Sequence, residues 1–487
     1  MATEVTAKRP AATQVRLGQP LGLVLIVLGA VALWVVNPLS PTTLVLLVVA
    51  VLFLMGLRKP VWAMAAILIS QLTITSYMWN APTGTAISLR LALLVALGLL
   101  LWYRSSTCKI EFGPGFKRVM IPAMVLIAMS LVSNLINSGG DFAFRDFRNM
   151  AVGLMIVAFI PAVVSGVKDL KLLSLVTLVG ITASAALGVL QYYNLMGAGG
   201  KTVIDGFLLR WQDGIRVPGM AETELELAYV VSTAIVVLLA LYLLKRRSGA
   251  NWELLMPVPL LGLALYFTYT RSAILAAILG MAALVILLRT HVRWQYIVAA
   301  SLLLVMLVSW TGVLEGNYLG GRSEGAQDES AFSRKIVWQA GLSIAVDNPI
   351  LGIGGDQFAA VSPRYQGAVD PELIEWEASR YWGHRSLGNT AVHNDFLNVL
   401  VSYGVIALVA YLWLYMVVAR NLFESYKSSR SRFIRGLALG LAAALVVYVV
   451  NAFYHNCFAT IPLFWVLVGL SVAVAKLALR KPGNDPV

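Results

Sequence analysis

The sequence predicts an all-α polytopic membrane protein with about 12–14 transmembrane helices and one large extracytoplasmic loop. Three observations lead to this fold class: the composition, the length of the apolar stretches and the alternation of basic loops. Of the 487 residues, 59% are hydrophobic and only 13% are charged, and the mean hydropathy is +0.79. Because soluble domains carry about 25% charged residues, this composition excludes an ordinary soluble globular protein.

The apolar stretches have the length that a bilayer requires of a helix, which is about 17–25 residues. The ninth of them carries Pro257 and Pro259 and is the weakest. In chain order, we predict spans near residues 20–36, 42–57, 61–79, 89–103, 119–137, 150–166, 172–196, 225–244, 253–268, 273–288, 295–314, 396–419, 434–452 and 457–475.

Basic residues orient these spans. Most of the 37 lysines and arginines fall in alternate loops and in both tails, which is the pattern of cytoplasmic segments. We therefore expect both termini in the cytoplasm and interpret the net charge of +13 as a topology signal rather than as a nucleic-acid-binding surface. The first apolar segment is expected to be an uncleaved helix, because a second one follows at once and no small-x-small cleavage site is evident.

The expected organisation has five parts. These are a cytoplasmic tail (1–19), a transmembrane bundle of about 11 helices (20–314), an extracytoplasmic loop (315–392), further transmembrane helices (393–475) and a second tail (476–487). Cys108 and Cys457 are predicted on opposite sides of the membrane, so we expect no disulfide between them. Two cysteines, no histidine pair at metal spacing and no Asp-x-Asp predict a protein without a metal site or cofactor.

Arginine dominates the basic residues that remain on the outer face. Its planar guanidinium binds phosphate oxygens in bidentate fashion, so the set indicates a phosphorylated ligand. The alternative for each arginine is an ion pair with an outer acid or contact with lipid headgroups. Arg271 is the strongest candidate, because a turn of a few residues holds it at the bilayer surface. The other candidates are Arg216 in Arg216-Val217-Pro218-Gly219, the pair Arg145 and Arg148 three residues apart, and Arg210.

The large loop contains one predicted amphipathic helix at about 333–346, with Ser333 as its N-cap and Asn348-Pro349 after its end. Residues 320–331 are polar and are expected to be mobile. The glycine-rich segment 351–355 is predicted to be a flexible turn rather than a phosphate-binding loop, since no strand precedes it and no GK[ST] follows. Residues 372–385 mix aromatic and polar side chains, including Trp382 and Arg385, and suit either a sugar-binding surface or an interfacial helix.

His393 stands where the loop re-enters the membrane. A neutral imidazole there can take a proton from an acceptor hydroxyl, whereas a purely structural histidine would only cap or hydrogen-bond the loop. Asn394 or Asp395 could serve as the cap instead. His455 is a second histidine expected on the outer face. The centres of the predicted spans carry no ionisable residue, which argues against an ion-coupled carrier but leaves a facilitator open.

Three segments together resemble the bacterial O-antigen ligase/O-antigen polymerase superfamily. Val392-His393-Asn394-Asp395-Phe396-Leu397, with Gly404 ten residues after Asn394, resembles the His-Asn motif of the family. Arg334-x-x-x-Trp338 followed by Asn348-Pro349-Ile350-Leu351-Gly352-Ile353-Gly354 resembles the segment before that motif, and Thr270-Arg271-Ser272 resembles an outer-turn motif.

The resemblance implies a metal-independent glycosyltransferase of the bacterial inner membrane. It would take a glycan from an undecaprenyl-diphosphate carrier at the outer face and pass it to an acceptor hydroxyl. By position, His393 and Arg271 would be catalytic, and Arg271, Arg216, Arg210, Arg145 and Arg148 would hold the diphosphate. Contacts to the acceptor or glycan would come from Arg334, Trp338, Asn394, Trp382, Arg385 and His455. Implied partners are the lipid-linked glycan, the membrane and other polysaccharide-assembly proteins, but no nucleic acid.

Two departures bear on the choice between ligase and polymerase. The ligase form of the motif has Gly, Thr or Tyr three residues after its glycine, where this chain has Ala407. The Arg-x10-Gly repeats of polymerases are not seen on the outer face either, since no outer arginine has glycine eleven residues on. We lean towards a polymerase of O-antigen or exopolysaccharide repeat units, with a ligase to lipid A-core as the alternative. Alternatives of other classes are a transporter of a small anion or lipid-linked glycan and a scaffold subunit of an envelope complex.

Overall fold

The structure is a computed structural model that describes residues 41–72, 89–105, 110–137, 140–197, 216–221, 223–245, 252–288, 325–380, 386–389, 391–456, 458 and 462–480. Within these ranges the chain forms helices and no strand, as the composition predicts. The predicted spans at 20–36 and 295–314 lie outside the described residues.

Five of these helices are long and apolar enough to cross a membrane. They are α5 (Pro114–Asn137), α7 (Val167–Gly197), α8 (Glu224–Lys245), α16 (Asp395–Ser428) and α17 (Arg432–Tyr454). Shorter apolar helices are α2 (Pro41–Arg58), α3 (Pro60–Leu72), α4 (Leu89–Ser105), α6 (Gly140–Val163), α9 (Pro257–Phe267), α10 (Arg271–Leu287) and α19 (Leu463–Ala478). An all-α polytopic membrane protein is therefore confirmed.

Helix α17 lies at the centre of the bundle and packs on α8, α10, α16 and α19. Glycines allow two of these helices to approach it closely. A Cβ built on Gly440 would lie 2.9 Å from the Cα of Val237 on α8, and one on Gly280 of α10 would collide with Val447. Small residues play this part in membrane bundles because lipid gives helices no hydrophobic reason to associate, so van der Waals contact must hold them together.

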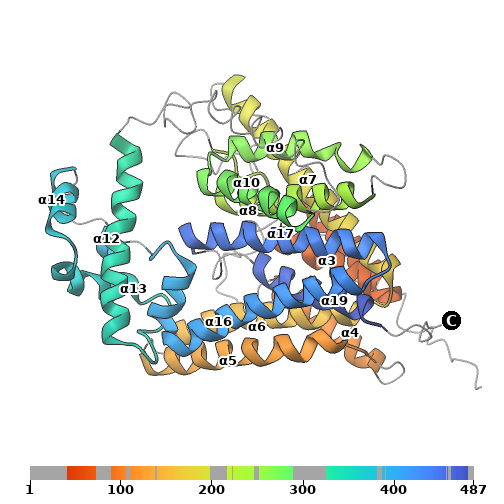
Figure 1. The fold of residues 1–487 in the computed structure, drawn as a ribbon, viewed down its shortest axis with the longest axis horizontal. Coiled ribbons are helices and arrows are strands. Elements are labelled where there is room, and N and C mark those ends of the chain that lie inside the picture. Colours follow the sequence, from red (N-terminus) through yellow and green to blue (C-terminus); the bar gives the residue numbers. More distant parts are fainter. Residues whose placement is uncertain are drawn as a thin grey trace, which may run out of the picture.

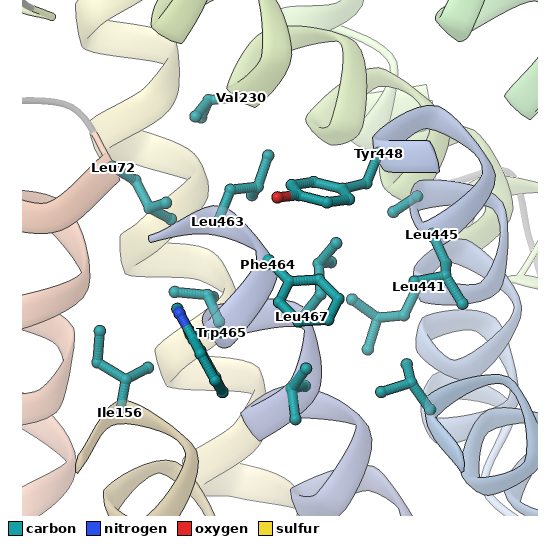
Figure 2. Packing of buried hydrophobic residues seen from close by; sticks show 14 of the residues in the cluster. Leu72, Ile156, Val230, Leu441, Leu445, Tyr448, Leu463, Phe464, Trp465 and Leu467 are labelled. Carbon is teal, nitrogen blue, oxygen red and sulfur yellow. The ribbon is translucent and has the colours of Figure 1, made fainter. Parts of the chain in front are cut away.

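The start of α19 fills the middle of the bundle. Figure 2 shows Leu463, Phe464, Trp465 and Leu467 of α19 surrounded by apolar side chains from α3, α6, α8 and α17. Phe464 is completely buried, and its ring lies 5.3 Å from the rings of both Tyr411 and Tyr448. This aromatic core fixes the C-terminal helices against one another and so supports the end of the bundle where α16 begins.

Helix α16 is broken at Gly404, which has φ 82° and ψ 179°. The break frees the carbonyls of Val401 and Ser402, which accept hydrogen bonds from the N–H groups of Ile353 (2.9 Å) and Gly354 (2.9 Å). Beyond the break, Val405 N–H donates to the carbonyl of Pro349 at 2.8 Å. The glycine-rich segment 351–355 is thus a turn, as predicted, but it is buried and hydrogen-bonded to α16 instead of flexible.

Helix α12 (Gly325–Asp347) crosses the end of the bundle at which α16 begins, and it runs across the long helices rather than along them (Figure 1). Small elements pack beside it: α13 (Phe358–Val361), a 3₁₀ helix (Ser362–Ala368), α14 (Pro371–Arg380) and α15 (Ser386–Asn389). We call this end the α12 end.

The prediction for this helix was right in part. It ends at Asp347, directly before Asn348-Pro349 as expected, but it begins at Gly325 instead of Ser333. Ser333 is therefore not an N-cap, and the polar segment 320–331 is helical from Gly325 onwards. The reason is that the polar residues before Ser333 continue the helical hydrogen bonding without contributing to an apolar stripe, so the amphipathic pattern alone does not reveal them.

Candidate active site

The candidate site begins at His393, directly before α16. Asn394 is the N-cap of that helix: it is extended (φ −158°, ψ 117°), and its side-chain oxygen accepts from the N–H of Leu397 at 3.0 Å. His393 adopts the left-handed conformation, with φ 55°, which is uncommon for a residue other than glycine. The cap thus belongs to Asn394, and His393 is held in a strained turn with its imidazole half-buried.

Burial lowers the pKa of His393, and the nearby positive charge of Arg334 lowers it further. The side chain is therefore a neutral imidazole at pH 7, with one ring nitrogen that can accept a proton. This is the protonation state that a general base requires.

Helix α12 brings Arg334 and Trp338 to His393. The two residues are four apart and so lie on one face of the helix. The indole Nε1 of Trp338 donates to the carbonyl of Val392 at 3.0 Å, and its ring contacts Phe453 edge-on with 5.5 Å between centroids. Trp338 thereby ties α12 to the residue before His393. Burial lowers the pKa of Arg334, although Tyr229 and Tyr454 act in the opposite direction, and a guanidinium remains charged.

His455 joins the same cluster from the end of α17. Its ring lies edge-on to that of His393 with 6.3 Å between centroids, and 5.9 Å from the ring of Tyr229. Burial lowers the pKa of His455 to about 3, and electrostatic interactions with Arg334, His393 and Arg216 lower it further. His455 is therefore neutral across the physiological range. We call His393, His455 and Arg334 the histidine cluster.

Arg216 lies close enough for its charge to act on His455. It also forms a salt bridge with Glu224 at 2.7 Å, which is the ion pair that the sequence left open as an alternative to phosphate binding. Its segment is fixed by the neighbouring backbone. Gly219 (φ 61°) exchanges two hydrogen bonds of 2.9 Å with the side-chain amide of Gln191.

Arg271 is the first residue of α10, and its side chain is exposed. The turn before it includes Tyr269 in the left-handed conformation (φ 50°). Val217 N–H donates to the carbonyl of Phe267 at 3.2 Å, so the segment of Arg216 is bonded directly to the end of the helix that precedes this turn. The structure therefore places the Arg216 segment, the Arg271 turn and the histidine cluster at one end of the bundle.

Several predicted site residues cannot be placed. Arg210, Trp382 and Arg385 lie outside the described residues, and Arg145 and Arg148 lie within α6 on side chains that the structure does not describe. Asn394, expected to contact acceptor or glycan, uses its side-chain oxygen to cap α16. In the described part of the chain, no three His, Cys, Asp or Glu side chains form a group that could hold a metal ion.

From the sequence, His455 was predicted to have only a minor role, and Asp395 only that of a cap. Asp395 is in fact completely buried and accepts from the N–H of Phe458, three residues after His455. The sequence does contain a signal for this role, which is a carboxylate at the first position of an apolar helix. A charged group that is buried there needs hydrogen-bond partners from other parts of the chain.

Comparison with known proteins supports the same assignment. Residues 256–412 match the family model described as O-Antigen ligase. The matched region contains Arg271, Arg334 and His393 but ends before His455. No curated protein matches the chain. The match confirms, over residues 256–412, the resemblance to the O-antigen ligase/polymerase superfamily.

Proposed function

We propose that this chain, which resembles the O-antigen ligase/polymerase superfamily over residues 256–412, transfers a glycan from an undecaprenyl-diphosphate carrier to an acceptor hydroxyl. The observation that carries the proposal is the histidine cluster, in which a neutral His393 lies beside the cationic Arg334 where α12 crosses the bundle. A base next to fixed positive charge is what transfer from a diphosphate leaving group needs.

In the proposed reaction, the acceptor oxygen attacks the anomeric carbon of the donor glycan. The bond between that carbon and the phosphate oxygen breaks, and its electron pair leaves with the diphosphate. The acceptor proton passes to the unprotonated nitrogen of His393. Because burial and Arg334 lower the pKa of His393, the imidazole is available as a base at neutral pH.

Charge that develops on the diphosphate requires donors fixed in advance, and each such donor typically contributes a few kcal/mol to the transition state. We assign this role to Arg271 at the start of α10 and to Arg216. Arg216 would exchange or share its bond to Glu224 when the donor binds. The other predicted diphosphate ligands, Arg210, Arg145 and Arg148, remain part of the proposal. No metal ion or cofactor is invoked.

The α12 end is proposed to face away from the cytoplasm at the inner membrane, with both termini on the cytoplasmic side. This orientation follows from the basic residues of alternate loops. The lipid carrier would then reach the arginines from the bilayer, whereas the acceptor would approach from the aqueous side under α12. Within the superfamily we propose a polymerase of repeat units, because Ala407 departs from the ligase motif.

The deciding experiment is a glycan analysis of the source organism without this gene, complemented by wild type, His393→Ala or His393→Gln. Single repeat units that accumulate on the carrier indicate a polymerase, and full-length chains that remain on the carrier indicate a ligase. Both histidine variants should insert at wild-type levels and fail to complement. Complementation by His393→Ala would remove His393 from the mechanism, and normal glycan in the deletion strain would refute the transferase and favour a transporter.

A further inference from the structure

We propose that Asp395 is a positioning residue that ties the segment after α17 to the start of α16 and so holds His455 beside His393 as a working part of the site. The inference rests on the proposed transferase function and deepens it, since it adds His455 and its support to the site. The family match includes Asp395 and Tyr411 but ends at residue 412, so His455 and the partners Tyr448 and Phe458 lie outside it.

Asp395 has no exposed surface. Both of its carboxylate oxygens lie 2.9 Å from the backbone nitrogen of Phe458, whose N–H donates to them. The hydroxyl of Tyr448 on α17 donates from 3.4 Å and that of Tyr411 on α16 from 3.5 Å. Tyr411 in turn accepts from Tyr415 at 2.9 Å. One carboxylate therefore joins both halves of the broken α16, the C-terminal part of α17 and Phe458 in the segment that follows α17.

The residue before Asp395 makes a second connection to the same segment. The N–H of Asn394 donates to the side-chain oxygen of Asn456 at 3.0 Å. The N-cap and the first residue of α16 are thus bonded to two residues that closely follow His455. Because His393 precedes the first pair and His455 precedes the second, the connections fix the two imidazoles relative to each other.

The other end of this segment is anchored in the aromatic core. Phe458 is buried, and its ring lies 4.9 Å from that of Tyr411 and 5.6 Å from that of Trp465. His455 itself ends α17, and its N–H donates to the carbonyl of Asn451. Between these two anchors, the hydrogen bonds with Asn394 and Asp395 hold the segment close to His393.

The position of His455 has a measurable signature. Its surroundings are Arg334, His393, Arg216 and the ring of Tyr229, and its burial is the largest cause of its lowered pKa. If the segment is released, water reaches His455 and its pKa rises towards the ordinary value of about 6.5. A substitution that only lowered global stability would leave the folded fraction with the same buried imidazole.

The test compares Asp395→Ala with Asp395→Asn, which retains an oxygen that can accept from Phe458. The control is Glu424→Ala, which removes a carboxylate that binds Arg118 and Arg420 away from the site. On the purified full chain, carbethoxylation by diethyl pyrocarbonate is quantified at each histidine by peptide mass spectrometry, with His291 and His384 as internal references. Glycan transfer is measured in parallel as a function of pH.

We expect Asp395→Ala to raise the carbethoxylation rate of His455 at least tenfold and to lower transfer at least tenfold. Asp395→Asn and Glu424→Ala should remain close to wild type in both. Loss of transfer in Asp395→Ala with His455 still protected would overturn the positioning role, as would a reactive His455 with unchanged transfer. The carbethoxylation rates need no substrate, so a chain that proves not to be a transferase would still show whether Asp395 holds His455.

Discussion

Replacement of Gly404 by alanine should destabilise the protein by an amount that the local geometry sets. The backbone there, at φ 82° and ψ 179°, is in a region essentially restricted to glycine, and a side chain in such a region costs on the order of 1–3 kcal/mol. A Cβ would also collide with the carbonyl of Ile350. To relieve that collision, the segment that contains Ile350 would have to move away from the break in α16.

Three backbone hydrogen bonds depend on that close approach. They run from Ile353 to Val401, from Gly354 to Ser402 and from Val405 to Pro349, and each contributes about 0.5–1.5 kcal/mol. With strain and the loss of two of these bonds, Gly404→Ala should lower the unfolding free energy by roughly 2–6 kcal/mol. The assay is equilibrium unfolding with SDS in mixed micelles, followed by tryptophan fluorescence and circular dichroism.

Gly262→Ala is the matched control. Gly262 lies inside α9, and a Cβ there would meet no atom within 4 Å. Alanine is favoured over glycine inside a helix by about 1 kcal/mol, so this substitution should be neutral or stabilising. The free energies of unfolding of Gly404→Ala and wild type could differ by less than about 0.5 kcal/mol, which is less than one typical hydrogen bond contributes. In that case the break in α16 does not depend on glycine, and the reasoning is refuted.

Four further predictions concern the site. Arg334→Gln removes one of the two causes that lower the pKa of His393, so the pH below which transfer is lost should move upwards. Arg334→Lys should keep that pH near the wild-type value. Equal pH profiles for wild type and Arg334→Gln would exclude Arg334 as a neighbour of the base. Trp338→Phe loses the bond to Val392 but keeps the ring, and should cost about 1 kcal/mol of unfolding free energy, with a larger loss for Trp338→Ala. Glu224→Gln should leave the KM for the donor unchanged or reduce it, whereas Arg216→Gln should raise that KM at least tenfold. A raised KM in Glu224→Gln with an unchanged KM in Arg216→Gln would make their salt bridge purely structural. EDTA should leave transfer unchanged, and restoration of lost activity by a divalent cation would contradict a metal-independent mechanism.

Hydropathy predicted the bundle well because a helix in lipid must be apolar along most of its length. It predicted helix ends poorly wherever a helix continues beyond the apolar part. Helix α6 begins at Gly140 rather than near residue 150, and α16 extends to Ser428 rather than 419. Backbone hydrogen bonding does not require apolar side chains, so polar helical turns at a membrane surface leave no mark in hydropathy.

The candidate site divides in the same way. His393, Arg334 and Trp338 could be found from the sequence because they lie in short motifs with fixed spacing. The partners of Asp395 could not, because Tyr448 and Phe458 lie more than fifty residues away and no local pattern tells which helix ends meet. For the same reason, His455 was predicted to have only a minor role. A lone histidine after an apolar stretch can be assigned to the site only when its contact with His393 is known.

The break at Gly404 and the contacts of Asp395 act on the same short piece of helix. Gly404 fixes residues 395–403 against the turn at 351–355, and Asp395 fixes the start of that piece against the segment after His455. If this piece is the support of the histidine cluster, Gly404→Ala should loosen His455 although it touches neither histidine. Folded Gly404→Ala protein should then show the raised carbethoxylation of His455 expected for Asp395→Ala, and the double variant should add little to either. Additive rates in the double variant would mean that the two supports act independently, because substitutions that remove the same constraint do not add.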